Sequence, residues 1–249
     1  MKALITGASS GIGKDIARVL SKMGYDLILV ARRRDRLEEL KNELKVNVEI
    51  ICADVSSKEN CFEIYEKVKG QDIDILINNA GFGIFGPFLK IDIEKELNMI
   101  DVNIKAVDIL TKLFLADFKK KDKGYILNVA SSAAFLPGPL LSSYYASKAY
   151  VLRLTEAVYE ELRREKSKVY IGALCPGPVD TEFNNVANVK FALKGLTSEY
   201  VAKYAVKKMF KKKLIIVPGF IMKCARVASK IIPEKLLLKI AYNQQRKKA

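Results

Sequence analysis

The sequence contains no histidine. The chain therefore cannot build a Ser-His-Asp or Cys-His nucleophile system, or a His-ligated zinc site, from its own side chains. Its four cysteines form no C-x-x-C pair, and the apolar run at Met1–Thr6 is too short for a secretory signal. These absences predict a cytoplasmic location and no metal site.

Long hydrophobic runs are also missing. No stretch approaches the roughly 18 uninterrupted apolar residues of a membrane-spanning helix, which favours a soluble or membrane-peripheral protein. The 249 residues, 50% of them hydrophobic, provide ample material for a continuous core. The charged fraction of 29% argues against a disordered or fibrous class, so we expect an ordered globular protein.

Positive charge is concentrated at the C-terminal end. The formal net charge is +15, and residues 201–249 carry +13 of it, with fourteen lysines and arginines against one acid, Glu234. A basic tail on a nearly neutral body suggests an anionic partner, such as membrane lipid, an acidic carrier or a phosphate-bearing ligand. The alternative is a charged face that only keeps the protein in solution.

Short β-branched apolar runs alternate with segments of helical period over the first two thirds of the chain. The expected strands are Lys2–Thr6, Asp26–Ala31, Val48–Cys52, Ile73–Asn78, Tyr125–Ala130, Val169–Leu174 and Leu214–Val217. Apolar stripes predict a helix from Ile12 to Met23 and another around Leu37, Leu40 and Leu44. This alternation predicts an α/β fold with a doubly wound, parallel, seven-stranded sheet and helices on both faces, in one domain over residues 1–219.

Residues 220–249 form a separate, basic extension. One apolar stripe consists of Phe220, Cys224, Ala228, Ile231 and Ile232, and a second consists of Leu236, Leu237, Ile240 and Ala241. Pro233 suits the start of a new helix between them. The pattern predicts two short amphipathic helices that cover a substrate entrance, dimerise, lie on a membrane surface or, as the most ordinary outcome, pack on the chain's own core.

The first strand runs into a glycine-rich turn, Thr6-Gly7-Ala8-Ser9-Ser10-Gly11-Ile12-Gly13, and then directly into a helix. Glycines permit close approach of backbone N–H groups to a pyrophosphate at the helix N-terminus, so this turn predicts a dinucleotide site. Its residues are Gly7, Ser9, Ser10, Gly11, Ile12 and Gly13. For this turn, the alternative to a dinucleotide site is a purely structural role. A second glycine pattern, G-x-G-x-x-G at Gly81, Gly83 and Gly86, has no helix after it and is interpreted as a loop.

The end of the second strand bears on the choice of dinucleotide. The strand ends at Ala31 and is followed by Arg32, Arg33 and Arg34, with no carboxylate to bind a ribose 2′-hydroxyl. Arg32 offers a forked donor for a 2′-phosphate, which favours NADP(H) over NAD(H). The alternative is a solvated basic helix start.

Three features together resemble the short-chain dehydrogenase/reductase family: the glycine turn, Asn78-Asn79-Ala80-Gly81, and Tyr144-Tyr145-Ala146-Ser147-Lys148. The resemblance covers residues 1–182, more loosely to about 218, and implies a Rossmann-type oxidoreductase. The signature Tyr-x-x-x-Lys occurs at Tyr65/Lys69, Tyr144/Lys148 and Tyr204/Lys208. The family also places a serine thirteen residues before the tyrosine, where this chain has Cys52, Ser131 and Phe191 respectively. Only Tyr144 qualifies.

These residue types suit proton transfer. Tyr144 and Lys148 fall at i and i+4 on one helical face, so the ammonium can lie near the phenol. Lowering a tyrosine pKa from about 10 toward 7 needs about 4 kcal/mol. An ammonium at ~4 Å with an effective ε of ~20 supplies about that much. Tyr144 then acts as general acid/base while hydride moves at the nicotinamide, and Ser131 holds the same oxygen. The resemblance further implies that Lys148 contacts the nicotinamide ribose and that Asn103 supports a water relay to it.

The resemblance implies further cofactor contacts. Asp54 and Val55 correspond to the adenine contact, and Asn79, with Ala80 and Gly81, to the segment near the cofactor. The loop that binds the nicotinamide carboxamide corresponds to Pro176, Gly177, Val179 and Thr181. Each match has a common turn or helix cap as its alternative.

Apolar residues surround the expected substrate position. They are Leu136, Leu140, Leu141, Phe183, Val186, Val189, Phe191, Leu193 and Leu196. They favour an NADPH-dependent reductase of a lipophilic ketone, aldehyde or 3-oxoacyl thioester, working in the carbonyl or the alcohol direction. An NADP(H)-binding sensor without turnover is the alternative, whereas nucleic-acid binding lacks a docking motif. Helices around 95–118 and 145–165 resemble the family's pairing surfaces and suggest a homodimer or homotetramer.

Overall fold

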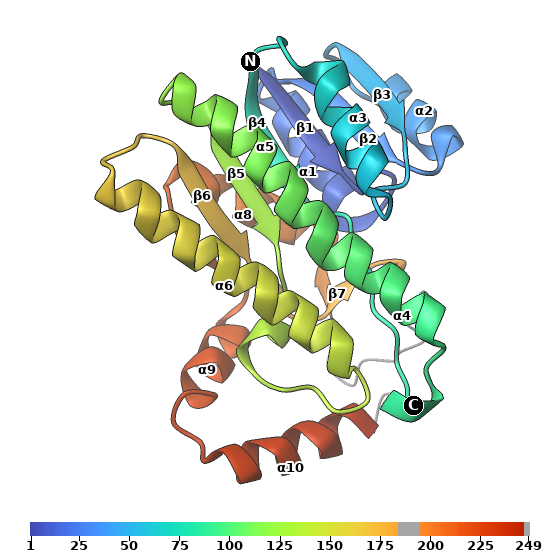
Figure 1. The fold of residues 1–249 in the computed structure, drawn as a ribbon, viewed down its shortest axis with the longest axis vertical. Helices are drawn as coiled ribbons and strands as arrows, with labels where there is room; N and C mark the ends of the chain where they lie inside the picture. Colours follow the sequence, from blue (N-terminus) through green and yellow to red (C-terminus); the bar gives the residue numbers. More distant parts are fainter. Residues whose placement is uncertain (184–194, 247–249) are drawn as a thin grey trace.

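The computed structural model describes residues 1–183 and 195–246 and contains a seven-stranded sheet in which every pairing is parallel. Its strands are β1 (Lys2–Thr6), β2 (Asp26–Ala31), β3 (Val48–Cys52), β4 (Ile73–Asn78), β5 (Tyr125–Val129), β6 (Tyr170–Leu174) and β9 (Ile215–Ile216). Their order is β3-β2-β1-β4-β5-β6-β9 (Figure 1). The predicted doubly wound parallel sheet is therefore confirmed, with small differences at the strand ends.

The direction of winding reverses between β1 and β4. From β1 the chain moves outward to β3, returns to β4 on the other side of β1, and then moves outward again to β9. At such a reversal the connections leave in opposite directions and open a crevice beyond the carboxyl ends of the two central strands. The glycine turn follows β1, and Asn79 follows β4, so both lie at this crevice.

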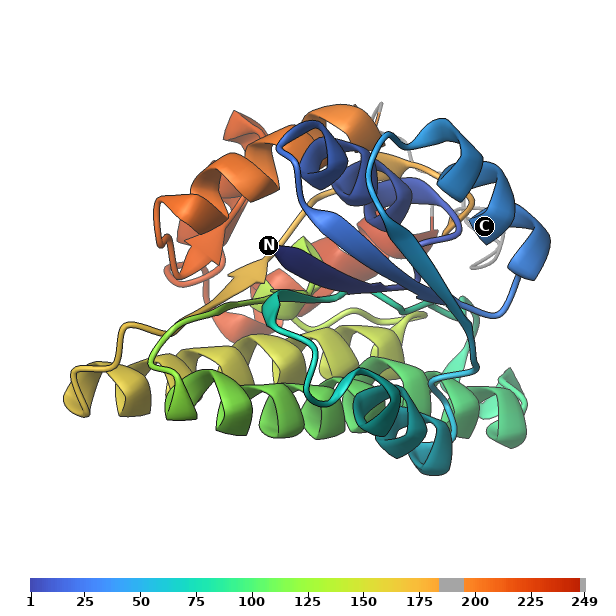
Figure 2. The same ribbon diagram turned by 90° about the horizontal axis from the view of Figure 1, so that it is seen from above.

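Helices cover both faces of the sheet, as predicted (Figure 2). One face is covered by α1 (Gly11–Lys22), α2 (Arg34–Glu43) and α8 (Ser198–Phe210). The other is covered by α3 (Lys58–Val68), α5 (Ala106–Lys120) and α6 (Ser142–Arg164), with α4 (Ile93–Ile100) leading into α5. Short 3-10 turns occur at Phe88–Lys90 and Ser132–Phe135. Because both faces are buried, β4 and β6 are buried over their whole length.

A buried polar ladder ties α5 and α6 to the sheet. Asn78 of β4 donates from Nδ2 to Oγ1 of Thr111 at 3.0 Å and to Oδ1 of Asn128 at 2.9 Å. Asn128 of β5 in turn donates from Nδ2 to Oγ1 of Thr155 on α6 at 3.0 Å. All four side chains are buried, so each bond replaces one that water would otherwise make.

We expect Asn128→Leu to lower the free energy of unfolding by about 1–3 kcal/mol, because it removes one acceptor from the buried Asn78 amide and one donor from the buried Thr155 hydroxyl. Urea denaturation measures the change. Asn42→Ala, at an exposed position of α2, is the control and should shift stability by less than about 0.5 kcal/mol. Equal stability of the two variants would contradict a stabilising role for the ladder.

A second, two-stranded sheet was not predicted. It pairs β7 (Val179–Asp180) with β8 (Leu196–Thr197) in parallel, and Thr197 caps the start of α8. Strands of two residues carry too little alternation to be recognised from sequence. The predicted substrate-facing residues Val186, Val189, Phe191 and Leu193 fall between these strands and lie outside the described residues.

The C-terminal extension forms two helices, α9 (Phe220–Ala228) and α10 (Glu234–Gln245), with Pro233 at the cap of α10 as predicted. The expectation that their apolar stripes pack on the core is wrong for α9, where Phe220, Cys224 and Ile231 of the first stripe are exposed. Ala241 of α10 is buried. In the described part of the chain no helix is both long and apolar enough to cross a membrane.

Candidate active site

The glycine turn is shaped by two positive backbone angles. Gly7 has φ +64° and Gly11 has φ +54°, a region that favours glycine. The side-chain amide of Asn79 donates to the carbonyl oxygens of Thr6 and Gly7 at 3.0 and 3.1 Å. A Cβ on Gly13 would overlap that amide and lie 2.6 Å from the Gly7 oxygen. The turn is thus closed against the end of β4 and has no room for a side chain at Gly13.

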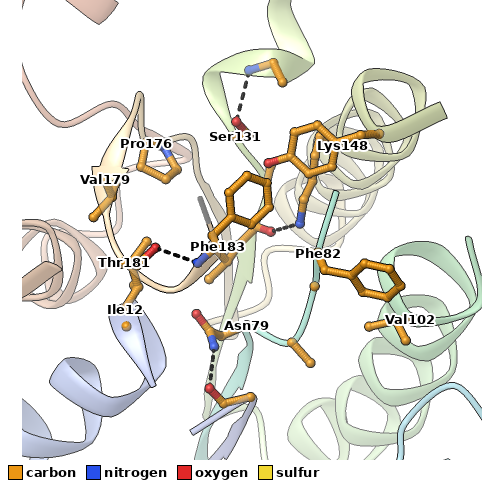
Figure 3. A pocket seen from close by; sticks show the side chains of 18 of the residues that line it. Ile12, Asn79, Phe82, Val102, Ser131, Lys148, Pro176, Val179, Thr181 and Phe183 are labelled. Carbon is orange, nitrogen blue, oxygen red and sulfur yellow. Dashed lines mark hydrogen bonds between the residues drawn. The ribbon is translucent and has the colours of Figure 1, made fainter. Parts of the chain in front are cut away.

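A single cavity of about 920 Å³ runs along the crevice. It is lined by these predicted residues: Gly7, Ser9, Ser10, Gly11, Ile12, Arg32, Asp54, Val55, Asn79, Ala80, Gly81, Ser131, Tyr144, Lys148, Pro176, Gly177, Val179 and Thr181. Ile12 and Asn79 lie toward one end of the view in Figure 3, and Ser131 and Lys148 toward the other. The structure therefore brings most of the predicted cofactor and catalytic residues to one space; the exceptions are Gly13 and Asn103, which do not line it.

The catalytic candidates come from the end of β5 and the first turns of α6. Ser131 caps the 3-10 turn, and its Oγ accepts from the backbone N–H of Ala133 at 3.1 Å. Lys148 is buried, donates from Nζ to the carbonyl oxygen of Val129 at 2.9 Å, and lies 6.0 Å from the centre of the Tyr144 ring. The phenol, hydroxyl and ammonium groups therefore gather around the same wall of the cavity.

Burial perturbs both titrating groups. It lowers the pKa of Lys148 to about 8, because the charged ammonium is removed from water. Burial also raises the pKa of Tyr144 above its ordinary value, although a hydrogen bond with Ser131 acts in the opposite direction. The predicted lowering of this pKa by Lys148 is therefore wrong for the protein's own groups, because desolvation is the largest effect. Perturbed groups of this kind that face a cavity mark candidate sites for proton transfer.

Asn103 does not line the cavity. It lies fully buried in a π-helical turn, Asp101–Lys105, between α4 and α5. Its Nδ2 donates to the Phe82 carbonyl oxygen at 2.9 Å and to Ser147 Oγ at 3.0 Å, and its Oδ1 accepts from the Phe82 N–H at 3.1 Å. A Cβ on Gly81 would lie 3.0 Å from both Asn103 Oδ1 and Lys148 Nζ. Asn103 therefore lies beside Lys148 across Gly81, and its relay role stays a prediction.

Arg33 lines the cavity although it is not among the predicted site residues. Its guanidinium donates to the hydroxyls of Ser9 and Ser10, each at 3.1 Å, and pairs with Glu182 at 2.9 Å. Arg32 also lines the cavity and pairs with Asp54 at 3.5 Å. Three adjacent arginines in sequence do not show which of them point to the turn, so only the structure distinguishes Arg33.

The other end of the cavity is apolar. Its lining residues there include Leu136, Leu141, Phe183, Met222, Leu237 and Ile240. Leu136, Leu141 and Phe183 were predicted, and the ring of Phe183 lies 5.3 Å from that of Tyr144. Leu140 and Leu196 do not line the cavity, and Leu196 packs on the core instead, so those two assignments are wrong.

Helix α10 forms part of this wall. Besides Leu237 and Ile240, it contributes Gln245, whose side-chain amide is hydrogen bonded to the hydroxyl of Tyr145. This contact joins α10 to the residue next to Tyr144. An open parallel α/β sheet with a glycine turn at its reversal point, facing a Tyr–Lys pair, defines a Rossmann-type nicotinamide-dependent oxidoreductase.

Comparisons with known proteins agree. The family model described as "short chain dehydrogenase" matches residues 1–192. An uncharacterized oxidoreductase of Staphylococcus epidermidis is 36% identical over 181 residues, covering 72% of this chain and 78% of that protein. The chain belongs to the short-chain dehydrogenase/reductase family and is an oxidoreductase that acts on CH-OH/C=O groups with a nicotinamide cofactor.

Two further relatives carry more specific names. The very-long-chain 3-oxoacyl-CoA reductase of Rattus norvegicus is 32% identical over 214 residues, covering 82% of this chain and 67% of that protein. A short-chain dehydrogenase from Sphingobium yanoikuyae, solved in complex with NADPH, is 31% identical with a TM-score of 0.82, and the match covers 88% of each chain.

Proposed function

We propose that this protein uses NADPH to reduce a lipophilic ketone or aldehyde, such as a 3-oxoacyl or steroid-like compound, to an alcohol. The observation that carries the proposal is the placement of Ser131, Tyr144 and Lys148 at the apolar end of a cavity whose other end is the glycine turn and two arginines. The names of the rat and Sphingobium relatives support the acyl substrate class and the cofactor.

The residues present fit a dinucleotide. The cavity of about 920 Å³ is lined by Gly7, Gly11 and Gly81, which present backbone groups instead of side chains to its interior. Ser9, Ser10 and the turn would hold the pyrophosphate, with Asp54 and Val55 at the adenine. Pro176, Gly177, Val179 and Thr181 would hold the nicotinamide end. When bound, NADPH supplies the hydride.

The chain's own groups handle the substrate oxygen. Tyr144 donates its proton to that oxygen as negative charge develops, and Ser131 donates a hydrogen bond to the same atom. Lys148 stabilises the resulting phenolate through its charge. Phe183, Leu136 and Leu141 line this end of the cavity with apolar groups, and in such surroundings these interactions are stronger than in solvent.

Arg32 and Arg33 should determine the preference for NADPH over NADH. Changing either one to glutamate should lower the ratio of NADH to NADPH dissociation constants at least tenfold, because a carboxylate repels the 2′-phosphate and accepts from a 2′-hydroxyl. Arg34→Glu is the matched control, since Arg34 pairs with Glu38 outside the cavity. Fluorescence titration with both cofactors measures the ratios, and equal ratios in all three variants would contradict the assignment.

The pH dependence of reduction should reflect Lys148. Below about pH 8 its ammonium is charged and can stabilise a phenolate on Tyr144; as pH rises through about 8, the charge is lost and kcat/KM for reduction should fall. Initial rates of NADPH oxidation across pH measure this. Lys148→Arg, which stays charged, should move the fall to higher pH. A wild-type profile without a fall across this range would contradict the role.

Three broader assignments accompany the proposed activity. We propose a division into a catalytic domain, residues 1–219, and a basic extension, residues 220–249. We propose a cytoplasmic protein that forms a homodimer or homotetramer through α5 and α6, the helices that correspond to the predicted pairing surfaces. Size-exclusion chromatography with light scattering tests the oligomeric state.

The experiment that tests the proposed function is NADPH oxidation against carbonyl compounds graded by chain length. The panel contains 3-oxoacyl thioesters, steroid ketones and small polar ketones. We expect kcat/KM to rise with apolar size, because the substrate end of the cavity is lined by Leu136, Leu141, Phe183 and Leu237. Measurable NADPH binding with no turnover on any compound would overturn the proposed reaction and favour a sensor.

A further inference from the structure

The outward side of α9 carries large apolar side chains that the described chain does not cover. Phe220 is 79% exposed, Val227 is 59% exposed and Ile231, just beyond the helix, is 76% exposed. On the opposite side, Met222 lies against Gly177, and Arg226 lies over the ring of Phe135 at 5.4 Å. Helix α9 therefore packs on the rest of the protein through Met222 and Arg226, and its most apolar side faces outward.

Helix α10 adds a row of basic side chains. Lys235, Lys239, Tyr242 and Arg246 are spaced by four, three and four residues, which places them on one helical face, and all four are exposed. Leu237 and Ala241 lie on the other side of the same helix, where they line the cavity. Both helices occupy the same end of the molecule, away from the N-terminus (Figure 1). Uncovered apolar groups and a basic row thus lie at the same end of the molecule.

From this arrangement we propose that α9 and α10 dock the protein on an anionic lipid bilayer. A bilayer accommodates both components, since apolar side chains enter the boundary between headgroups and acyl chains while lysines contact anionic headgroups, each worth about fivefold in affinity. Tyr242 belongs to the residue types that favour this boundary. The inference goes beyond the proposed reduction, and its test needs no turnover.

Charge argues against the other occupants of this surface. Residues 201–249 carry +13, with Glu234 as the only acid, so a second copy docked on the same face would bring like charges together. An acidic protein would neutralise the lysines, but it would have to cover Phe220, Val227 and Ile231 with an apolar surface of its own. An anionic bilayer satisfies the charge and the apolar side chains at once.

Co-sedimentation with phosphatidylcholine vesicles, with and without phosphatidylglycerol, tests the proposal. We expect at least roughly tenfold tighter binding when phosphatidylglycerol is present, and weaker binding at high salt. Lys235→Glu/Lys239→Glu should reduce the affinity at least roughly tenfold because two favourable charges are reversed. Phe220→Ser/Ile231→Ser should also release the protein, since it removes the apolar contacts. NADPH binding by each variant checks that the fold is intact.

The matched control is Lys207→Glu/Lys211→Glu. It makes the same charge change within residues 201–249, at exposed positions of α8 or just after it, outside α9 and α10. It should leave most of the vesicle binding in place. If the two double lysine variants lost the same amount of vesicle affinity, the proposal would be overturned, because the protein would then be attracted by its net charge alone. Absence of vesicle binding, with dimerisation that Phe220→Ser/Ile231→Ser abolishes, would assign the surface to a second copy instead.

Discussion

Tyr144→Phe should lower kcat for carbonyl reduction by roughly 10²–10⁴-fold while NADPH still binds. The change removes one oxygen from a half-buried side chain that lies beside Lys148 and Phe183 in the cavity. Without it, the neighbouring phenol of Tyr145 is hydrogen bonded to Gln245, and the chain has no histidine that could donate the proton instead. Single-turnover rates and fluorescence titration with NADPH separate the chemical step from cofactor binding.

Tyr145→Phe is the control for this experiment. Tyr145 is adjacent in sequence, lines the same cavity and has the same shape, but its hydroxyl is hydrogen bonded to Gln245 of α10. Its loss should change kcat less than about tenfold and act mainly on substrate KM. Comparable losses of kcat in the two variants would show that Tyr144 is not the specific acid.

Gly13→Ala should weaken NADPH binding at least roughly hundredfold. The added Cβ would overlap the Asn79 amide and lie 2.6 Å from the Gly7 oxygen, and the backbone oxygen has no freedom to rotate away. The turn must open, which misplaces the N–H groups that would contact the pyrophosphate. A loss of about 3 kcal/mol corresponds to this change in the dissociation constant.

Gly24→Asn, just beyond α1, tests whether any glycine change near this helix has the same effect. Gly24 has φ +81° and nothing lies within 4 Å of its added Cβ, and asparagine tolerates that backbone conformation. This variant should bind NADPH like the wild type. If Gly13→Ala also binds NADPH normally, the glycine turn does not form the pyrophosphate site.

Strong local signals explain how much of the fold could be predicted. The strands β1 to β4 were predicted with their observed bounds because each is a short β-branched run between turn residues. The π-helical turn around Asn103 could not be predicted, because the sequence Asp101–Lys105 continues a helical pattern. The exposure of Phe220 and Ile231 could not be predicted either, because hydrophobic periodicity identifies an apolar stripe but does not show whether that stripe is buried.

Sequence spacing identified the site residues that belong to motifs, but it could not identify those whose role depends on the three-dimensional fold. Spacing selected Ser131, Tyr144 and Lys148 from three candidate sets, and the structure brings them together. Arg33 and Gln245 were missed because their part in the cavity depends on side-chain direction and on a helix far along the chain. Neither forms a motif, so no signal in the sequence separates them from ordinary surface residues.

The burial of Lys148 has a consequence for heat resistance. In an unfolded chain its pKa is about 10.5, whereas burial lowers it to about 8. Below pH 8 the ammonium is charged in both states and the fold bears the full cost of desolvating it; that cost declines as pH rises from about 8 to 10.5, so stability increases across this window. An apolar residue here, as in Lys148→Met, should therefore raise the melting temperature at neutral pH while abolishing turnover. The residue that serves the proposed reaction would then also limit the heat resistance of the fold.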